Sequence, residues 1–121
     1  MSDIDEIMNE SEFLALAQDI LDSIEQQADV WFEQRDIDIE GTRNGNVLTL
    51  TFEDGSQAVV NSQAPMQEMW VAARSGGFHY RLKDGKWLDT RSGEELAQAL
   101  SRICSEQSGQ PIEVEVPSPT R

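Results

Sequence analysis

The chain has one cysteine, Cys104, and one histidine, His79, among its 121 residues. A single cysteine excludes an internal disulfide and gives no sign of an oxidising compartment. No apolar run approaches the roughly 18 residues of a membrane-spanning helix, and the acidic start 1–6 lacks the basic and apolar regions of a signal peptide. The sequence therefore predicts a soluble, cytoplasmic protein.

Basic residues are also scarce. The chain has 9 lysines and arginines against 23 aspartates and glutamates, for a formal net charge of −14, and no lysine precedes Lys83. Residues 1–60 carry −13 of this charge, and residues 61–121 carry only −1. Nucleic acids and anionic membrane surfaces both require basic protein surfaces, so the charge argues against both partners. The negative field of the first half would instead attract cations or a basic protein.

Two segments have the pattern of amphipathic helices. From Ser11 the apolar residues recur every three or four positions, which predicts a helix over roughly 12–32 with Ser11 as its N-cap. A second helix is predicted to open with a capping box at Ser92-Gly93-Glu94-Glu95 and to end near Gly109. The length suits one domain with frayed ends, which gives three expected ranges: 1–10 (frayed), 11–116 (domain) and 117–121 (frayed).

Between the helices the apolar period changes to two. Residues 36–40 alternate acidic and apolar side chains, which predicts a first strand. Turn signals at Asn44-Gly45, Asp54-Gly55 and Asp84-Gly85 then separate further short β segments. We predict an antiparallel meander of about six strands with both helices on one face. This is an α+β two-layer sandwich whose other sheet face is open to solvent.

Seven acidic residues are expected to lie together, and we call them the acidic ridge: Asp22, Glu25, Asp29, Glu33, Asp36, Asp38 and Glu40. The first four have helical spacing and share one face of the first helix. The last three alternate along the predicted strand and share one of its faces. A short link places the two sets side by side, with Arg35 as the only basic residue nearby.

Three interpretations of the acidic ridge stay open. In the first interpretation, the ridge is a solvated face that keeps the protein soluble, although mixed charges usually serve that purpose. In the second, the ridge binds a hard cation such as Mg²⁺, Ca²⁺, Mn²⁺ or iron, since carboxylate oxygens suit these ions. The ridge contains no Cys or His for zinc or copper, and without a closed cage its binding would be weak. In the third interpretation, the ridge docks a strongly basic protein in a salt-dependent way. The last two interpretations can coexist.

Four other residues invite a functional interpretation. Pro65 cannot donate to a sheet ladder, so the chain before Trp70 is expected to bend or to start an edge. Trp70 is either a core aromatic or an exposed anchor on the open sheet face. We expect His79 to be a packed or surface strand residue and Cys104 to be buried and inert. One His and one Cys do not supply a nucleophile with its base and orienting group, so no enzyme is predicted.

Four motifs in the chain form a specific combination: Leu48 to Ser56, Asn61-x-Gln63-x-Pro65-x-x-x-x-Trp70, Gly76-Gly77-Phe78-His79-Tyr80, and Trp87-x-Asp89-x-Arg91-Ser92-Gly93-Glu94. Together they resemble the frataxin family, and most closely its bacterial, CyaY-type members. The resemblance extends from about Ser11 to Val114. It implies the same helix–sheet–helix sandwich that the periodicity predicts.

The resemblance implies iron handling in iron–sulfur cluster assembly. In the family an acidic ridge at this place binds Fe²⁺ and Fe³⁺, and in bacterial members it docks on a basic patch of cysteine desulfurase. The family's exposed tryptophan corresponds to Trp70, with Asn61 and Gln63 nearby. This surface is implied to contact the assembly machinery, including the iron–sulfur scaffold protein.

The expected protein is therefore an iron-binding adaptor and not an enzyme, monomeric unless iron drives oligomers. The alternatives are a ferroxidase or oligomeric iron store, and an acidic interaction module with no metal role. Gln26, Val30 and Phe32 occupy positions where close relatives often carry acids. The acidic ridge is correspondingly thinner, which affects the expected number and affinity of bound ions more than the docking role.

Overall fold

The computed structural model describes residues 8–119. Along the chain, one helix precedes six strands and a second helix follows them, and a short 3-10 turn separates the third strand from the fourth. In chain order the elements are α1 (Glu10–Arg35), β1 (Ile39–Asn44), β2 (Val47–Phe52), β3 (Gln57–Gln63), η2 (Ala64–Met66), β4 (Glu68–Ala73), β5 (Gly76–Lys83), β6 (Lys86–Asp89) and α2 (Leu96–Ser108). Among the described residues, no helix combines the length and apolar content needed to cross a membrane.

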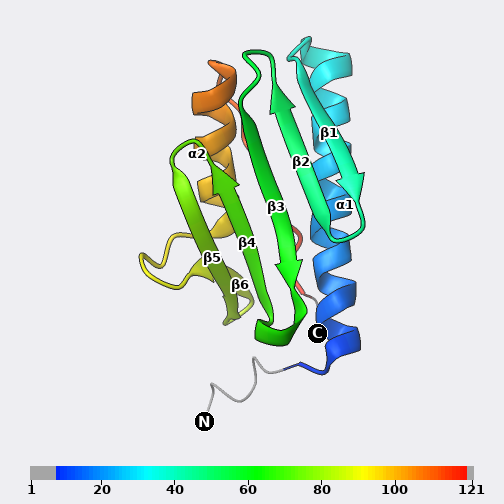
Figure 1. Ribbon diagram of the computed structural model, residues 1–121, viewed down its shortest axis with the longest axis vertical. Helices are drawn as coiled ribbons and strands as arrows, with labels where there is room; N and C mark the ends of the chain where they lie inside the picture. The colour runs from blue at the N-terminus through cyan, green and yellow to red at the C-terminus, as the bar shows by residue number, and fades with distance from the viewer. Residues whose placement is uncertain (1–7, 120–121) are drawn as a thin grey trace.

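The strands form one antiparallel sheet in the order β1-β2-β3-β4-β5-β6. Both helices lie behind this sheet, with α1 along the β1 edge (Figure 1). Each strand is therefore joined to its neighbour by a short turn, as in a meander. The predicted two-layer α+β sandwich with one open sheet face is confirmed.

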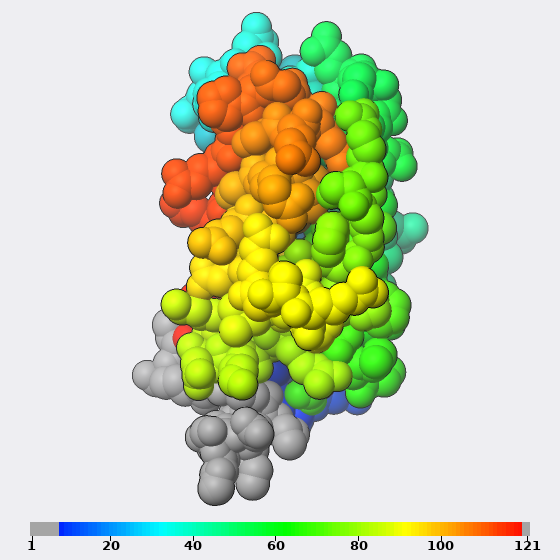
Figure 2. All heavy atoms as spheres, turned by 90° about the vertical axis from the view of Figure 1, so that its left-hand side faces the viewer, coloured from blue at the N-terminus to red at the C-terminus, as the bar shows by residue number. Residues whose placement is uncertain are grey.

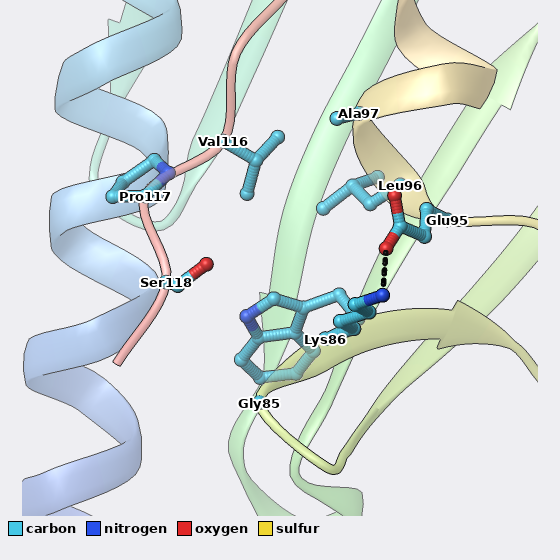
Figure 3. Close-up of a pocket in the computed structure, with 9 residues that line it drawn as sticks. Gly85, Lys86, Glu95, Leu96, Ala97, Val116, Pro117 and Ser118 are labelled. Atoms are coloured by element: carbon cyan, nitrogen blue, oxygen red, sulfur yellow. Dashed lines mark ion pairs between the residues drawn. The ribbon is translucent and has the colours of Figure 1, made fainter. Parts of the chain in front are cut away.

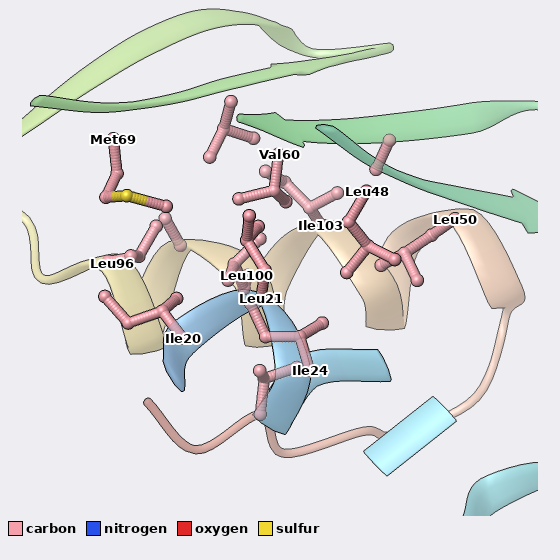
Figure 4. Close-up of a cluster of buried hydrophobic side chains, with 14 of the residues drawn as sticks. Ile20, Leu21, Ile24, Leu48, Leu50, Val60, Met69, Leu96, Leu100 and Ile103 are labelled. Carbon is pink, nitrogen blue, oxygen red and sulfur yellow. The ribbon is translucent and has the colours of Figure 1, made fainter. Parts of the chain in front are cut away.

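The core lies between the helices and the sheet. Alternate residues of β2, Leu48 and Leu50, point toward the helices and are fully buried. Ile20 and Ile24 of α1 and Leu100 of α2 meet them from the opposite layer (Figure 4). Burying each such side chain contributes roughly 1.5–3 kcal/mol, which makes this interlayer core the main source of stability.

Helix α1 begins two residues earlier than its pattern predicts. Its N-cap is Asn9, whose side chain accepts a hydrogen bond from the backbone of Glu12, while the Glu12 side chain accepts one from the backbone of Asn9. The predicted cap at Ser11 is wrong because this reciprocal capping box satisfies two backbone donors at once. Met8 is also buried, and its backbone N–H donates to Gln67 at 3.1 Å. Residues 8–10 are thus part of the fold, and 1–7 lie outside the described residues.

The segment after α1 is not the strand that its alternation predicts. The helix ends at Asp36, which has a left-handed backbone with φ 60°. The ladder with β2 starts only at Ile39, opposite Phe52. Ile37 and Ile39 are both buried and Asp38 is exposed. The alternation of apolar and acidic residues therefore comes from an irregular connection that buries every second side chain, and not from a strand. Asp36 and Asp38 therefore do not share a strand face with Glu40.

Helix α2 begins at Leu96, and the capping box predicted at Ser92–Glu95 is wrong. The cap residue is Glu95, and its side chain makes no capping hydrogen bond. Ser92 belongs to a turn held by Asp89, whose carboxylate accepts from the backbone N–H groups of Arg91 and Ser92 at 2.7 and 3.4 Å. Gly93, with φ 80°, then redirects the chain into the helix.

The residues after α2 cover the gap between the two helices. Ile112 and Val114 are buried in the core, as their alternation with glutamates predicts. Ser105 of α2 bonds both backbone groups of Ile112 through its hydroxyl, and Ser101 accepts from the N–H of Val114 at 2.8 Å. Figure 2 shows this tail, in red, lying along α2.

Candidate functional site

The first two members of the acidic ridge, Asp22 and Glu25, are joined to β1 by an arginine. Arg43 of β1 places its Nη1 atom 2.6 Å from Asp22 Oδ1 and 3.6 Å from Glu25 Oε1. The Cγ atom of Glu25 also lies close above β1, 3.7 Å from where a side chain at Gly41 would begin. Asp22 and Glu25 are therefore brought together at the interface of α1 and β1, and their charges are partly neutralised.

Arg35 is not the basic residue that faces the acidic ridge. Its guanidinium donates to the carbonyl oxygen of Pro111 at 2.8 Å, which directs it toward the C-terminal tail. The sequence-based expectation that Arg35 is the only nearby positive charge is thus wrong, and Arg43 takes that place. Arg43 reaches Asp22 and Glu25 because β1 packs against α1, a contact that no local pattern in the sequence indicates.

The other five members of the acidic ridge are exposed: Asp29, Glu33, Asp36, Asp38 and Glu40. Within residues 8–119 none of these five forms an ion pair. Asp29 and Glu33 lie on the last turns of α1, Asp36 and Asp38 in its connection to β1, and Glu40 on β1 itself. They follow one continuous stretch of chain around the end of the helix, and they are the ridge carboxylates that no basic side chain in residues 8–119 pairs with.

These carboxylates do not converge on a point. Among the described residues, no three His, Cys, Asp or Glu side chains come close enough to form a metal-binding group. Any cation held here would therefore keep most of its water and contact one or two carboxylates, as Mg²⁺ often does. Two apolar side chains, Val30 and Phe32, lie exposed in the same part of α1.

The open sheet face carries the second set of predicted site residues. Asn61 and Gln63 of β3 lie on this face and are joined by a hydrogen bond of 2.8 Å from Gln63 Nε2 to Asn61 Oδ1. Trp70 of β4 pairs in register with Asn61. Its side chain is half-buried and alternates with the buried Met69 and Val71. Trp70 is therefore on the open face, and of its two predicted places the core is excluded.

Three residues that the sequence did not mark as a site surround Trp70. The indole stacks on His79 of β5, with ring centroids 4.2 Å apart and an angle of 6° between the planes. The indole N–H donates to Glu68 at 2.8 Å, and Arg81 binds the other carboxylate oxygen of Glu68. We call Glu68, Trp70, His79 and Arg81 the Glu68 cluster. Only the register of β4 and β5 brings these four residues together, so no motif in the sequence indicates the Glu68 cluster.

Two hollows lie elsewhere on the surface. A cavity of about 60 Å³ lies between the start of α2 and the C-terminal tail. It is bordered by the ion pair between Lys86 Nζ and Glu95 Oε2, which are 3.4 Å apart (Figure 3). Trp87 also lines this cavity, and its indole nitrogen is buried without a hydrogen-bond partner in the described structure. A larger hollow of about 300 Å³ lies between β5 and the turn before α2, where His79 and Arg91 are among its lining residues.

Cys104 is buried on α2, as its place on the apolar stripe predicts. Burial raises the pKa of its thiol to about 12, so the reactive thiolate is essentially absent at neutral pH. His79 lies on the open sheet face against the carboxylate of Glu68 and the ring of Trp70, whereas Cys104 is buried in the helical layer. Cys104 and His79 are therefore not paired as a nucleophile and its base.

Comparison with known proteins places this architecture in a family. The profile described as a frataxin-like domain matches residues 6–110. The iron–sulfur cluster assembly protein CyaY of Bordetella parapertussis is 64% identical over 107 residues, which cover 88% of this chain and 98% of that protein.

Solved structures give the same result. The frataxin of Psychromonas ingrahamii superposes with a TM-score of 0.77 at 36% identity, over 88% of this chain and 97% of that one. The trimeric frataxin of Saccharomyces cerevisiae, in its complex with ferrous, gives a TM-score of 0.67 at 25% identity, over 78% of this chain and 86% of that one. The domain profile, the sequence identity and the shared sandwich agree, and this chain belongs to the frataxin-like family.

Proposed function

We propose that this protein is a non-enzymatic, iron-binding adaptor of iron–sulfur cluster assembly that docks on cysteine desulfurase and adjusts its rate. One observation carries the proposal: five exposed carboxylates surround the end of α1 with no ion-pair partner in residues 8–119. Relatives that share 64% of the aligned residues are named iron–sulfur cluster assembly proteins. A surface of one sign attracts a partner of the opposite sign, and the basic patch of a desulfurase is such a partner.

The charge distribution indicates where docking is centred. Arg43 neutralises part of the charge of Asp22 and Glu25, so the field is strongest further along α1 and in its connection to β1. We therefore assign the main contact to Glu33 and Asp38 and their exposed neighbours. Because exposed charges act over about a Debye length, the docking should weaken steeply with salt.

Iron is the cation that this role requires, and hard carboxylate oxygens suit both of its common oxidation states. An iron ion would bind one or two of the exposed carboxylates at a time, and water would complete its coordination; the candidates are Asp29, Glu33, Asp36, Asp38 and Glu40. Bound iron would also relieve the repulsion among these charges, so it should stabilise the fold. The ferrous complex of the yeast protein supports iron as the ligand.

The open sheet face is a second contact in this proposal. Asn61, Gln63 and Trp70 present two amides and an aromatic ring on adjacent strands β3 and β4. Half-buried tryptophans surrounded by polar groups are typical of binding hot spots. β4 lies three strands from β1 in the sheet, so this surface is distinct from the acidic ridge, and we assign it to the iron–sulfur scaffold protein.

The docking role is tested by charge reversal. The double variant Glu33→Lys with Asp38→Lys removes two ridge carboxylates and avoids Asp36, whose left-handed backbone a lysine would strain. The matched control, Glu106→Lys with Glu113→Lys, makes the same change in net charge at exposed positions on α2 and the tail. We expect the first variant to bind purified desulfurase at least about tenfold more weakly at low salt, and the control to bind within about threefold of the wild type. Equal loss in both variants would reduce the ridge to a general charge effect.

The iron role is tested by titrating Fe²⁺ anaerobically while recording the amide NMR spectrum. Selective broadening of amides between Asp22 and Glu40 supports the site, and uniform weak broadening supports an acidic module with no metal role. Oxygen consumption on adding Fe²⁺ in air, measured against a protein-free control, tests the ferroxidase alternative. A rate well above that control would replace the adaptor with an iron-oxidising protein.

A further inference from the structure

Glu68 is a buried carboxylate on the sheet face that lacks a helical layer. It is the first residue of β4, and its side chain is only 3% exposed. Met69 points into the core, so Glu68 points the other way, onto the same face as Trp70. A carboxylate buried away from the core needs bound partners to offset its lost hydration, and the surrounding side chains supply them.

Both carboxylate oxygens of Glu68 are used. Oε1 accepts the indole N–H of Trp70 at 2.8 Å, and the Nδ1 atom of His79 lies 3.7 Å from it. Oε2 accepts a hydrogen bond from Nε of Arg81 at 2.9 Å and forms an ion pair with its Nη2 atom, 2.8 Å away. Arg81 lies directly opposite Glu68 in the β4–β5 register, and His79 lies opposite Trp70. One buried charge thus links two neighbouring pairs across two strands.

These contacts fix the indole of Trp70 at two points. Its single hydrogen-bond donor is held by Glu68, and one face of its ring is held by the stacked imidazole of His79. A side chain restrained in this way loses little further freedom when a partner binds, which favours affinity. The N–H of Trp70 is already used, so the ring and its edges are what the residue offers to a partner.

We infer that Glu68 is a positioning residue, which holds Trp70 and His79 in the orientation that the open face presents to its partner. The inference rests on the proposed docking of the scaffold protein on Asn61, Gln63 and Trp70. Arg81 supplies the opposite charge that offsets the burial of the Glu68 carboxylate beside the two rings. Glu68 itself is covered by these side chains and is not assigned a contact with the partner.

Two variants of Glu68 separate its two bonds. Glu68→Ala removes the acceptor for Trp70 and the partner of Arg81, whereas Glu68→Gln keeps one oxygen acceptor for the indole and puts an uncharged amide N–H₂ group where Arg81 binds. The matched control is Asp54→Asn, in the turn between β2 and β3, which weakens another arginine–carboxylate bond, to Arg74 at 2.7 Å. All three variants change net charge by one unit.

The first measurement uses the free protein. In the NMR spectrum of the indole N–H groups, Trp70 is assigned with Trp70→Phe, and exchange with water is followed. We expect Glu68→Ala to speed exchange of the Trp70 indole N–H and shift its signal, Glu68→Gln to do so less, and Asp54→Asn to leave it unchanged. Unchanged exchange and shift in Glu68→Ala would overturn the inference, whatever the partner does.

The second measurement is the affinity for the purified scaffold protein, with Trp70→Ala as reference. We expect Trp70→Ala and Glu68→Ala each to weaken binding on the order of tenfold, Glu68→Gln to weaken it less, and Asp54→Asn to have no effect. Loss with Trp70→Ala but none with Glu68→Ala overturns the positioning role. If Trp70→Ala binds normally, the proposed docking on this face fails, and the part of the inference that concerns the indole is decided by the exchange measurement alone.

Discussion

Arg43 of β1 lies under α1 with its Nη1 atom 2.6 Å from Oδ1 of Asp22. The arginine side chain is mostly buried, 14% exposed, and its Nε atom donates to the carbonyl oxygen of Gly45 at 2.7 Å. A cation in this position both joins the strand to the helix and reduces the charge of the acidic ridge. At this end of the ridge, the ion pair that joins β1 to α1 therefore also reduces the negative charge that could attract a cationic partner.

Replacing Arg43 with methionine should separate these two effects. The free energy of unfolding should fall by about 1–2 kcal/mol, because hydrogen bonds to Asp22 and Gly45 are lost. The freed carboxylates should at the same time strengthen desulfurase binding at low salt. Urea denaturation and binding at two salt concentrations measure the two effects. The control is Arg74→Met, an exposed arginine whose loss changes net charge equally. It should alter binding less than Arg43→Met, and equal gains would contradict a local role for Arg43.

The C-terminal tail depends on serine hydroxyls in place of a strand ladder. Ser105 Oγ accepts from the N–H of Ile112 at 2.9 Å and donates to its carbonyl oxygen at 3.0 Å. Ser105→Ala should therefore lower the free energy of unfolding by about 1–2 kcal/mol, since both backbone groups of Ile112 lose a partner. Ser108→Ala is the control, because that hydroxyl bonds only the exposed Gln110. Chemical denaturation measures both, and an equal cost in the two variants would show that the tail is not held in this way.

Stability should fall at alkaline pH, and Cys104 should contribute to the fall. Burial raises the pKa of its thiol from 9.0 to about 12, so between these values the unfolded chain loses a proton that the folded chain keeps. The contribution of the protonated thiol is complete below pH 9 and is lost as pH rises, by about 1.4 kcal/mol per pH unit. Burial also raises the pKa of Tyr80, which acts in the same direction.

Denaturation midpoints of wild type and Cys104→Ala between pH 8 and about 11 test this contribution. The variant should be less stable at pH 8, because a buried side chain is shortened, but its stability should fall less steeply with pH. Parallel curves would show that the thiol is not the titrating group. At pH 8 the native wild-type thiol should also react with alkylating reagents far more slowly than it does in the unfolded chain.

The local patterns of the sequence were sufficient for the layers of this fold. The alternation of Leu48 and Leu50 and the helical spacing of Ile20 and Ile24 agree with their burial, because period and burial are directly linked. The turn at Asn44-Gly45 was also predicted correctly. Helix starts were less predictable. Asn9 with Glu12, and Ser92 with Glu95, have the same spacing, yet only the first pair forms a capping box.

The candidate sites divide in the same way. The exposure of Asp29 and Glu33 follows from their helical spacing, whereas the pairing of Asp22 and Glu25 with Arg43 depends on how β1 packs along the helix. The Glu68 cluster was missed entirely, because Glu68 and Arg81 become neighbours only through the β4–β5 register. A charged residue at a strand start looks solvated in the sequence, and its burial is decided by side chains from another strand.

Asp36 is the ridge residue whose cost to the fold can be separated from its proposed role. It follows the last residue of α1, where a negative charge opposes the helix dipole, and its φ of 60° is in the left-handed region. Asparagine adopts this backbone as readily as aspartate does and has no charge. Asp36→Asn should therefore raise the free energy of unfolding by about 0.3–1 kcal/mol at low ionic strength.

Asp38→Asn provides the comparison, since it removes the same charge from an exposed residue beyond the helix end. We expect Asp38→Asn to stabilise the protein less, and both variants to weaken desulfurase binding and to reduce the stabilisation by Fe²⁺. Thermal unfolding with and without Fe²⁺, and binding at low salt, measure all three effects. If Asp36→Asn is more stable and also binds less well, the charge at the helix end is kept at a cost to the fold, which a purely solubilising surface does not require. If it is more stable and binds equally well, the contact lies elsewhere on the acidic ridge.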